Sequence, residues 1–366
     1  MRSTQVCVIS REAGPGSLEV RTSDIGDPPP GQVRVRIEAA GVSYGDLLFQ
    51  RGVVPGGPKP VYTPGCDLTG KVEALGSGVT GLAPGQRVAA LVVSGGYSSA
   101  AHVPAERLVP VPEQVNPFQA AAVVLNCFIA YQMLHRVARV SSGQRVLVHG
   151  ASGGVGLAFL QLLEQIGGVQ VFGTCSSANS ELVRRHGAVP IDYRAEDFAG
   201  VVRAHGGGLD AVFDHVGGTH FLRSYRLLRR GGCLVAYGQN DALRNGRPSK
   251  RVGAVGFLGG IAAPKLVPDG RRTVFYNAWS LEKTQPSAYR ADLAGVLSLV
   301  AAGKIAPKSV TVMQLADAAR AFQSLEQGVA AKIVLDCARR GPSGVSWPLS
   351  ASARTSTASP ALPPTQ

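Results

Sequence analysis

The stretch VHGASGGVG, residues 148–156, decides the fold because it joins an apolar run to an amphipathic one through glycines and small residues. The run before it, RVLVHG (145–150), is predicted to be a strand covered on both faces. Behind the glycines, apolar residues recur at helical spacing until Gly167, which is typical of a helix end. The stretch is therefore a strand-to-helix turn.

This turn has the features of a dinucleotide-binding loop. A helix N-terminus presents unpaired N–H groups and a partial positive charge, and small residues let a pyrophosphate approach the backbone. The fingerprint is incomplete, because its first glycine position is Ala151. A tight structural turn is the alternative, and the surrounding strand–helix alternation favours nucleotide binding. The predicted contacts in the loop are Ser152, Gly153, Gly154 and Val155.

Short apolar runs alternate with helical patterns after Asn116-Pro117, which is a typical helix start. This rhythm predicts an α/β fold with a doubly wound, Rossmann-type parallel sheet. The predicted strands are RVLVHG (145–150), VQVFGT (169–174), AVPID (188–192), LDAVFDHV (209–216) and CLVAYG (233–238), with RTVFYN (272–277) as a sixth candidate.

Residues 1–115 instead hold closely spaced β-like runs separated by Pro and Gly, which predicts a small, mostly antiparallel β domain. The segments after residue 289, including KIVLD (332–336), do not continue the strand–helix rhythm. We expect them to return to that first domain. The tail from Arg340 is rich in Ser, Pro and Thr and is expected to be disordered.

Composition narrows the function classes. The 366 residues allow two ordinary domains. The longest uncharged stretch, residues 114–134, is broken by Pro117 and Asn126, so we expect no transmembrane segment and a cytoplasmic protein. The net charge of +13 comes mostly from scattered arginines. This pattern favours anionic ligands rather than specific nucleic-acid binding.

The end of the second predicted strand indicates which dinucleotide would bind. NAD-binding folds place an acid there, whereas GTCSS (173–177) has none. Small hydroxyls leave room for a 2′-phosphate, and Arg184, Arg185 and Arg194 could supply charge or could simply be solvated. NADPH is therefore the predicted cofactor. Its predicted contacts at this strand end are Thr174, Ser176 and Ser177.

Several segments together resemble the medium-chain dehydrogenase/reductase superfamily, from about Val6 to Asp336. Within it the chain is similar to the zinc-independent quinone oxidoreductase (zeta-crystallin-like) branch, and to its vesicle-amine-transport-protein-like subgroup. The segments are AAGVSYGD (39–46), YTPGCDLTGKVEALG (62–76), GGYSSAAHV (95–103), GASGGVG (150–156), DHVGG (214–218), and the runs LNCFIAYQML, VFGTCSS and PIDYRAEDF.

The resemblance implies a homodimer with a discontinuous GroES-like domain over residues 1–125 and 281–339. The nucleotide domain is then residues 126–280, and the tail that composition predicts to be disordered is residues 340–366. It also implies no zinc, because the ligand positions of zinc alcohol dehydrogenases fall at Ser43, Cys66 and Leu125. The chemistry implied is hydride transfer from NADPH to a small-molecule α,β-unsaturated carbonyl or a quinone.

The resemblance further suggests which residues form the site. Tyr44 and Asn126 are the predicted catalytic residues, and Ser43 is expected near the nicotinamide. Asp46 lies nearby and more plausibly caps a turn than handles protons. The other predicted cofactor contacts are Tyr193 near the adenosine, Gly238 and Gln239 after the fifth strand, and Phe275, Tyr276 and Asn277 beside the ring.

Two alternatives stay open. The chain could be a non-catalytic NADPH-binding regulatory or interaction protein, or another biosynthetic oxidoreductase on the same scaffold. The basic and apolar segment 239–272 bears on this choice. It is interpreted as a lid over the substrate or as a patch for a membrane or partner, with a packed surface loop as the plain alternative.

Overall fold

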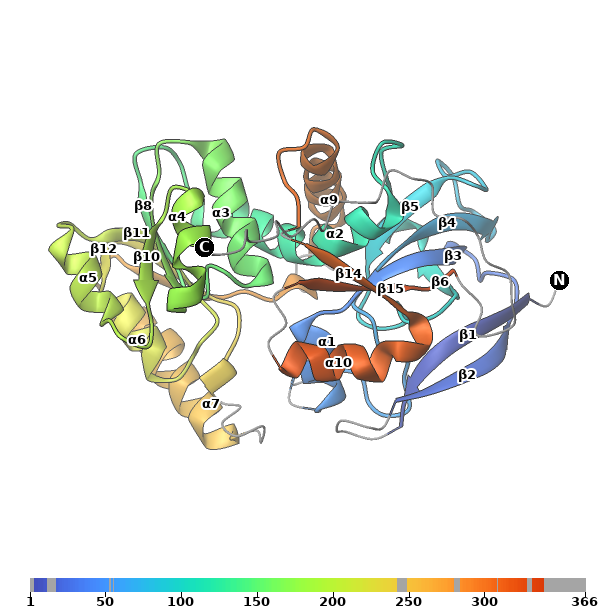
Figure 1. Ribbon diagram of the computed structural model, residues 1–366, viewed down its shortest axis with the longest axis horizontal. Coiled ribbons are helices and arrows are strands. Elements are labelled where there is room, and N and C mark those ends of the chain that lie inside the picture. Colours follow the sequence, from blue (N-terminus) through green and yellow to red (C-terminus); the bar gives the residue numbers. More distant parts are fainter. Residues whose placement is uncertain are drawn as a thin grey trace, which may run out of the picture.

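The computed structural model describes residues 3–11, 18–52, 54, 56–241, 249–279, 284–307, 309–327 and 331–338. The tail predicted to be disordered, 340–366, lies outside these residues. Two large sheets organise the described chain, and helix α2 (Pro117–Gln132) runs between them (Figure 1). A separate pair, β1 (Ser3–Ser10) and β2 (Leu18–Ile25), lies at the outer edge.

The first large sheet is parallel and contains all six predicted strands. Its order is β10-β9-β8-β11-β12-β13, so the first strand in sequence, β8, lies beside β11 where the order reverses. This is the doubly wound arrangement that the sequence predicts. The strands are β8 (Arg145–Val148), β9 (Gln170–Cys175), β10 (Val189–Asp192), β11 (Leu209–Asp214), β12 (Leu228–Ala236) and β13 (Arg272–Phe275).

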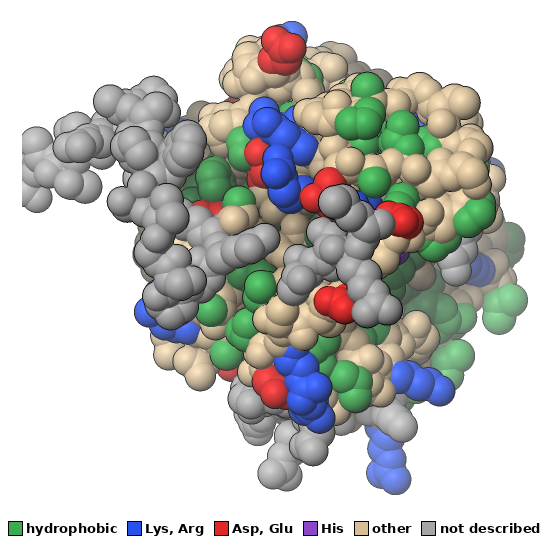
Figure 2. Space-filling view, turned by 90° about the vertical axis from the view of Figure 1, so that its right-hand side faces the viewer, with side chains coloured by type: hydrophobic (Ala, Val, Ile, Leu, Met, Phe, Trp, Pro, Cys, Tyr) green, Lys and Arg blue, Asp and Glu red, His purple; other side chains and the backbone are tan. Residues whose placement is uncertain are grey.

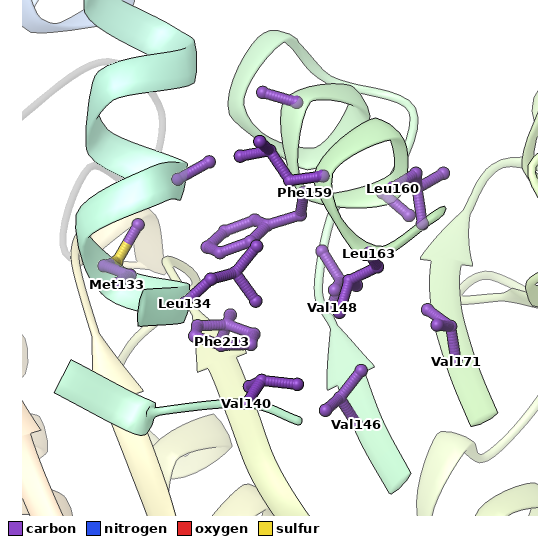
Figure 3. Packing of buried hydrophobic residues seen from close by; sticks show 14 of the residues in the cluster. Met133, Leu134, Val140, Val146, Val148, Phe159, Leu160, Leu163, Val171 and Phe213 are labelled. Atoms are coloured by element: carbon purple, nitrogen blue, oxygen red, sulfur yellow. The ribbon is translucent and has the colours of Figure 1, made fainter. Parts of the chain in front are cut away.

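Helices cover both faces of this sheet. On one face, α3 (Gly154–Ile166) packs Phe159 against Phe213 of β11, while Leu134 closes the layer from the α2 side (Figure 3). On the other face, a second apolar cluster joins the sheet to the helices α5 (Phe198–Ala204) and α6 (Thr219–Tyr225). Helix α4 (Ser180–Arg185) connects β9 and β10.

The second large sheet is mostly antiparallel and includes strands from both ends of the chain. Its order is β14-β15-β3-β4-β5-β7, with β6 also pairing with β3. The late strand β15 pairs antiparallel with β3, which places the C-terminal segments in the early sheet. The strands are β3 (Gln32–Gly41), β4 (Asp67–Leu75), β5 (Arg87–Leu91), β6 (Ala100–Pro104), β7 (Val109–Pro110), β14 (Val310–Gln314) and β15 (Lys332–Asp336).

Helix α2 begins as predicted. The Asn116 side chain accepts a hydrogen bond from the Gln119 N–H at 2.9 Å, and Pro117 opens the first turn. The helix passes without a break through the predicted domain boundary at 125/126, where Leu125 is buried and Asn126 is partly exposed. The exact domain limits stay a prediction.

The same helix bears on the membrane question. With its continuation, the segment η2 (Met133–Ala138), it forms 22 residues that are long and apolar enough to cross a bilayer, the only such helix among the described residues. The sequence predicts no transmembrane segment. Core helices of folded proteins meet the same criteria, and 67% of the apolar window is buried inside the protein.

The remaining helices lie beside the second sheet and helix α2. Helices α1 (Tyr44–Gln50) and α10 (Ala318–Glu326) lie together on the side of the second sheet, while α9 (Pro286–Ala301) packs against α2 (Figure 1). In the segment 239–272, helix α7 (Lys250–Phe257) is followed by the turns η5 (Leu258–Ala262) and η6 (Ala263–Leu266).

Candidate functional site

The glycine-rich turn connects β8 to α3 at the carboxyl edge of the parallel sheet. Gly150 has a φ of +65°, and its N–H donates to the Thr174 hydroxyl at 2.9 Å. The Ala151 N–H donates to the Thr174 carbonyl at 2.8 Å. Gly153 is the N-cap of α3 and provides no side-chain cap. The first N–H groups of α3 are therefore open to an anionic group.

The glycines of this turn have different physical roles. A Cβ on Gly156 would clash with the Gly150 carbonyl, so this glycine allows the helix and the strand to pack closely. A Cβ on Gly154 would lie 2.5 Å from Nδ2 of Asn126. Gly153 is exposed, and its Cβ would be 3.3 Å from the nearest atom, the Gly150 carbonyl oxygen. A side chain at Gly153 would therefore extend toward solvent rather than into the protein interior.

Thr174 takes a different place from the predicted one. It is 3% exposed, and its hydroxyl accepts the Gly150 N–H and lies 3.3 Å from Nδ1 of His149. The side chain therefore holds the turn from beneath. Ser176 accepts a hydrogen bond from the Asn179 amide at 3.1 Å, and Ser177 is exposed beyond the strand end.

The predicted cationic partners differ in availability. Arg184 forms an ion pair with Glu181 at 2.8 Å. Arg194 lies over the ring of Tyr193, which is 56% exposed and whose N–H donates to the Cys175 carbonyl. Tyr193 and Arg194 therefore stand beside the end of β9. Arg185 is exposed at the end of α4.

The Ser43–Asp46 segment is built as a capping box at the start of α1. The Ser43 hydroxyl donates to Asp46 Oδ2 at 2.6 Å, and the Asp46 N–H donates back to the Ser43 hydroxyl. The same Oδ2 accepts the Tyr97 hydroxyl at 3.1 Å. Asp46 thus caps the turn. Tyr44 is partly exposed, and desolvation raises the pKa of its phenol, so it is protonated at neutral pH.

The other predicted residues divide into two groups. Gly238 and Gln239 pack on the DHVGG turn, residues 214–218: a Cβ on Gly238 would be 2.9 Å from the His215 carbonyl, and one on Gly217 would be 2.9 Å from the Gln239 Cα. Tyr276 is different, because it is 6% exposed and its hydroxyl donates to Gln132 at 2.7 Å. This phenol faces the interior and not a ring site.

The neighbours of Tyr276 stay near the surface. Phe275 is 40% exposed and meets Phe257 of α7 edge-on at 5.7 Å. The side-chain oxygen Oδ1 of Asn277 accepts the Trp279 N–H at 3.0 Å. Three neighbouring strands end at the same edge of the sheet: β13 ends at Phe275, Gln239 lies just after β12, and the DHVGG turn follows β11. Ligands bind at this edge in open α/β sheets.

The three positions that would hold catalytic zinc do not fit a metal ion. The Ser43 hydroxyl is bound to Asp46. Cys66 is buried and carries the one strong zinc ligand among the three positions. Leu125 carries no donor atom. In the described part of the chain, a cluster of three potential ligands occurs only elsewhere, at His149, Asp214 and His220.

Sequence reasoning missed His215 and the buried residues beneath the turn. A Cβ on Gly150 would clash with Nε2 of His215, so this ring lies directly against the glycine turn. His149, Asp214 and Ser224 are each 0% exposed and lie close to it. The DHVGG segment was the available signal, but a motif does not show which side chains turn inward.

Comparisons with known proteins agree with this architecture. Residues 29–113 match a family model described as the alcohol dehydrogenase GroES-like domain, and residues 186–335 match one described as zinc-binding dehydrogenase. The synaptic vesicle membrane protein VAT-1 homolog of Danio rerio is 32% identical over 311 residues, covering 83% of this chain and 64% of that protein. The chain spans about half the length of such curated relatives, 54% for the one from Rattus norvegicus.

Solved structures give the same result over nearly the whole chain. A quinone oxidoreductase of Pseudomonas syringae pv. Tomato DC3000 has a TM-score of 0.79 and 27% identity, covering 91% of this chain and 100% of that one. A mycobacterial protein complexed with NADPH has a TM-score of 0.76 and 29% identity, covering 91% and 99%.

Proposed function

Because the chain belongs to the medium-chain dehydrogenase/reductase superfamily, in its quinone oxidoreductase-like branch, we propose that it is an NADPH-dependent reductase of an activated alkene or a quinone. The observation that carries this proposal is the open start of α3. Gly153 is exposed there, beside the point between β8 and β11 where the strand order reverses. Pyrophosphates bind at such switch points.

The residues present fit a dinucleotide. The N–H groups of Gly154 and Val155 would hold the diphosphate, with Ser152 beside them. Ser176, Ser177 and Arg194 would face the 2′-phosphate. When bound, NADPH supplies the hydride. Tyr44 and Asn126 would donate hydrogen bonds to the substrate oxygen, and Tyr44 would also donate the proton to the reduced product.

The reaction would not use zinc, because the Ser43 hydroxyl is bound to Asp46 and Leu125 carries no donor atom, which leaves only Cys66 of the three ligand positions. A hydride acceptor with an electron-poor alkene or a quinone ring needs only hydrogen bonds to its developing oxyanion. The homodimer and the cytoplasmic location stay predictions of the resemblance.

One observation favours a second candidate, a non-catalytic NADPH-binding interaction protein. The segment 250–267 displays large apolar side chains, with Val255, Leu258 and Leu266 at 69%, 61% and 86% exposure. Such a surface suits a partner or a lipid as well as a substrate lid. On the face seen in Figure 2, basic side chains stand in separate groups, some of them beside acidic ones, and not in the continuous basic surface that favours nucleic-acid binding.

A single experiment separates these functions. The purified chain is titrated with NADPH and then tested with a panel of enones and quinones, following NADPH oxidation. Turnover of at least one acceptor class supports the reductase. Tight NADPH binding without turnover of any acceptor supports the interaction protein, and the absence of NADPH binding contradicts both.

A further inference from the structure

Four buried polar side chains connect the carboxyl ends of three adjacent strands. Thr174 is the penultimate residue of β9, His149 follows β8, and Asp214 ends β11, while Ser224 comes from α6. Three of the four are 0% exposed and Thr174 is 3% exposed, in an interior made of apolar side chains. Buried polar groups of this kind are kept only when they are hydrogen-bonded.

Their hydrogen bonds form an unbroken series, which we call the strand-end chain (Thr174, His149, Ser224 and Asp214). The Thr174 hydroxyl lies 3.3 Å from His149 Nδ1, and His149 Nε2 lies 3.1 Å from the Ser224 hydroxyl. The Ser224 hydroxyl donates to Asp214 Oδ2 at 2.7 Å. The chain therefore connects a hydroxyl under the glycine-rich turn to a carboxylate in the DHVGG turn.

Each end of the strand-end chain holds a backbone turn. At one end the Gly150 N–H donates to the Thr174 hydroxyl at 2.9 Å. At the other end the Val216 N–H donates to Asp214 Oδ1 at 2.8 Å, and the Gly217 N–H reaches the same oxygen at 3.4 Å. The two turns lie on either side of the place where the strand order reverses.

In the strand-end chain, every hydrogen bond is donated in the same direction, from Thr174 toward Asp214. Because Ser224 donates its single proton to the carboxylate, it must accept from His149 Nε2, which therefore carries the ring proton. His149 Nδ1 is then an acceptor for the Thr174 hydroxyl proton, and the Thr174 oxygen remains free to accept from Gly150. Every member is satisfied. The same Nε2 proton occupies the lone pair that a metal ion at His149, Asp214 and His220 would need.

The charges agree with this assignment. Burial lowers the pKa of His149 to about 3, so the ring is neutral at ordinary pH. Burial also works against ionisation of Asp214. Hydrogen bonds from His220 and from the Ser224 hydroxyl favour the carboxylate, outweigh that effect and hold the pKa of Asp214 below its ordinary value. A carboxylate at one end thus polarises the whole series of hydrogen bonds.

We infer that the strand-end chain fixes the glycine-rich turn and the DHVGG turn relative to each other, which makes His149, Ser224 and Asp214 positioning residues of the nucleotide site. The inference rests on the proposed function for its effect on NADPH. None of these three side chains needs to touch the nucleotide, because the strand-end chain reaches the two turns through the backbone N–H groups bound by Thr174 and Asp214.

The Asp214→Asn variant tests the direction of hydrogen-bond donation along the strand-end chain. The carboxamide can donate to Ser224, which then donates to His149 Nε2 and moves the ring proton to Nδ1. We expect the ring nitrogen chemical shifts of His149 in the labelled full chain to report Nε2–H in the unmodified protein and Nδ1–H in the variant. The Gly150 amide resonance should shift as well. An Nδ1–H ring in the unmodified protein, or an unmoved Gly150 amide in the variant, overturns the inference.

Ser224→Ala tests the effect on the site from a distance. This variant interrupts the chain on α6, and we expect the Kd for NADPH to rise roughly tenfold, which corresponds to about 1.4 kcal/mol. Asp292→Asn is a control at a second buried polar site, matched to Asp214→Asn, since Asp292 of α9 bonds Gln132 of α2 and Arg136 of η2. Its Kd should not change.

The outcomes separate the two proposals. If the unmodified chain binds NADPH and Ser224→Ala binds it equally well, the positioning role is overturned while the proposed function stands. If the unmodified chain does not bind NADPH, the proposed function fails. The amide chemical shifts of Gly150 and Gly217 in Ser224→Ala can still be measured, because they require no nucleotide. If both resonances move, the strand-end chain couples the two turns.

Discussion

The side-chain amide of Asn126 rests directly against Gly154: a Cβ at position 154 would lie 2.5 Å from Nδ2 of Asn126. Helix α2 therefore meets the first turn of α3 through one amide and one glycine. Asn126 was proposed as a catalytic residue on the strength of a resemblance. The contact gives it a defined position beside the loop that is proposed to hold the diphosphate.

This contact predicts a non-additive double-mutant cycle. Gly154→Ala should lower the free energy of unfolding by about 1–3 kcal/mol, because the new methyl group overpacks the site. In the Asn126→Ala background the amide is absent, so the same substitution should cost much less. Chemical denaturation of the four proteins measures the coupling. Equal costs of Gly154→Ala in both backgrounds would show that the two residues do not meet.

Tyr44 is expected to donate a proton to the product. Desolvation raises the pKa of its phenol, which keeps the proton available at neutral pH. Tyr44→Phe should lower turnover of an enone by about a hundredfold, the lower part of the range for general acids, without changing the Kd for NADPH. Tyr225→Phe is the control, since that hydroxyl bonds Asp269 on the outer part of the nucleotide domain. Full activity in Tyr44→Phe would assign the proton to another donor.

Arg194 is expected to set the preference for NADPH over NADH. Its guanidinium lies over the exposed Tyr193 ring beside the end of β9. Arg194→Gln should weaken NADPH binding roughly tenfold and leave NADH binding unchanged, because only the 2′-phosphate loses a charged partner. Arg184→Gln should change neither, since Arg184 is paired with Glu181. Parallel titrations with both nucleotides make the comparison. Equal losses for the two nucleotides would argue against a 2′-phosphate contact.

Asp67 is expected to make stability depend on pH. Burial raises the pKa of Asp67 to about 7 from an ordinary value of 3.8, although Lys332 and the Gly41 N–H oppose the shift. Between these values the folded protein holds a proton that the unfolded chain has released. The free energy of unfolding should therefore fall as pH rises through this window and level off above it.

Asp67→Asn removes this contribution, so its stability should change less between pH 4 and 7 than that of the unmodified protein. Asp27→Asn is a control, because that side chain is 72% exposed. Denaturant titrations at several pH values give the two slopes. A slope in Asp67→Asn that matches the unmodified protein would show that Asp67 is ionised in the folded state.

The sequence was sufficient for the parallel sheet, for the start of α2 at Asn116 and for the position of the glycine turn. Each depends on local periodicity or capping chemistry. It was not sufficient for Thr174 and Tyr276, whose hydroxyls turn inward to Gly150 and Gln132. Both partners are distant in sequence, so no local pattern reveals the direction of either side chain. The same reason hid the strand-end chain.

The central claim is that a diphosphate lies against the open backbone at the start of α3. Gly153 tests it most directly, because it is exposed and its Cβ would approach only the Gly150 carbonyl oxygen, at 3.3 Å, whereas a Cβ on Gly156 would clash with that same carbonyl and disturb the fold itself. Gly26, with no atom within 4 Å of its Cβ position, provides the control.

The decisive measurement is a titration of Gly153→Val and Gly26→Val with NADPH, alongside the free energy of unfolding of each. The account predicts a loss of affinity of about a hundredfold or more in Gly153→Val, equivalent to about 2.7 kcal/mol, with stability close to that of the unmodified protein. Gly26→Val should bind normally. An unchanged Kd in a folded Gly153→Val protein would contradict the account.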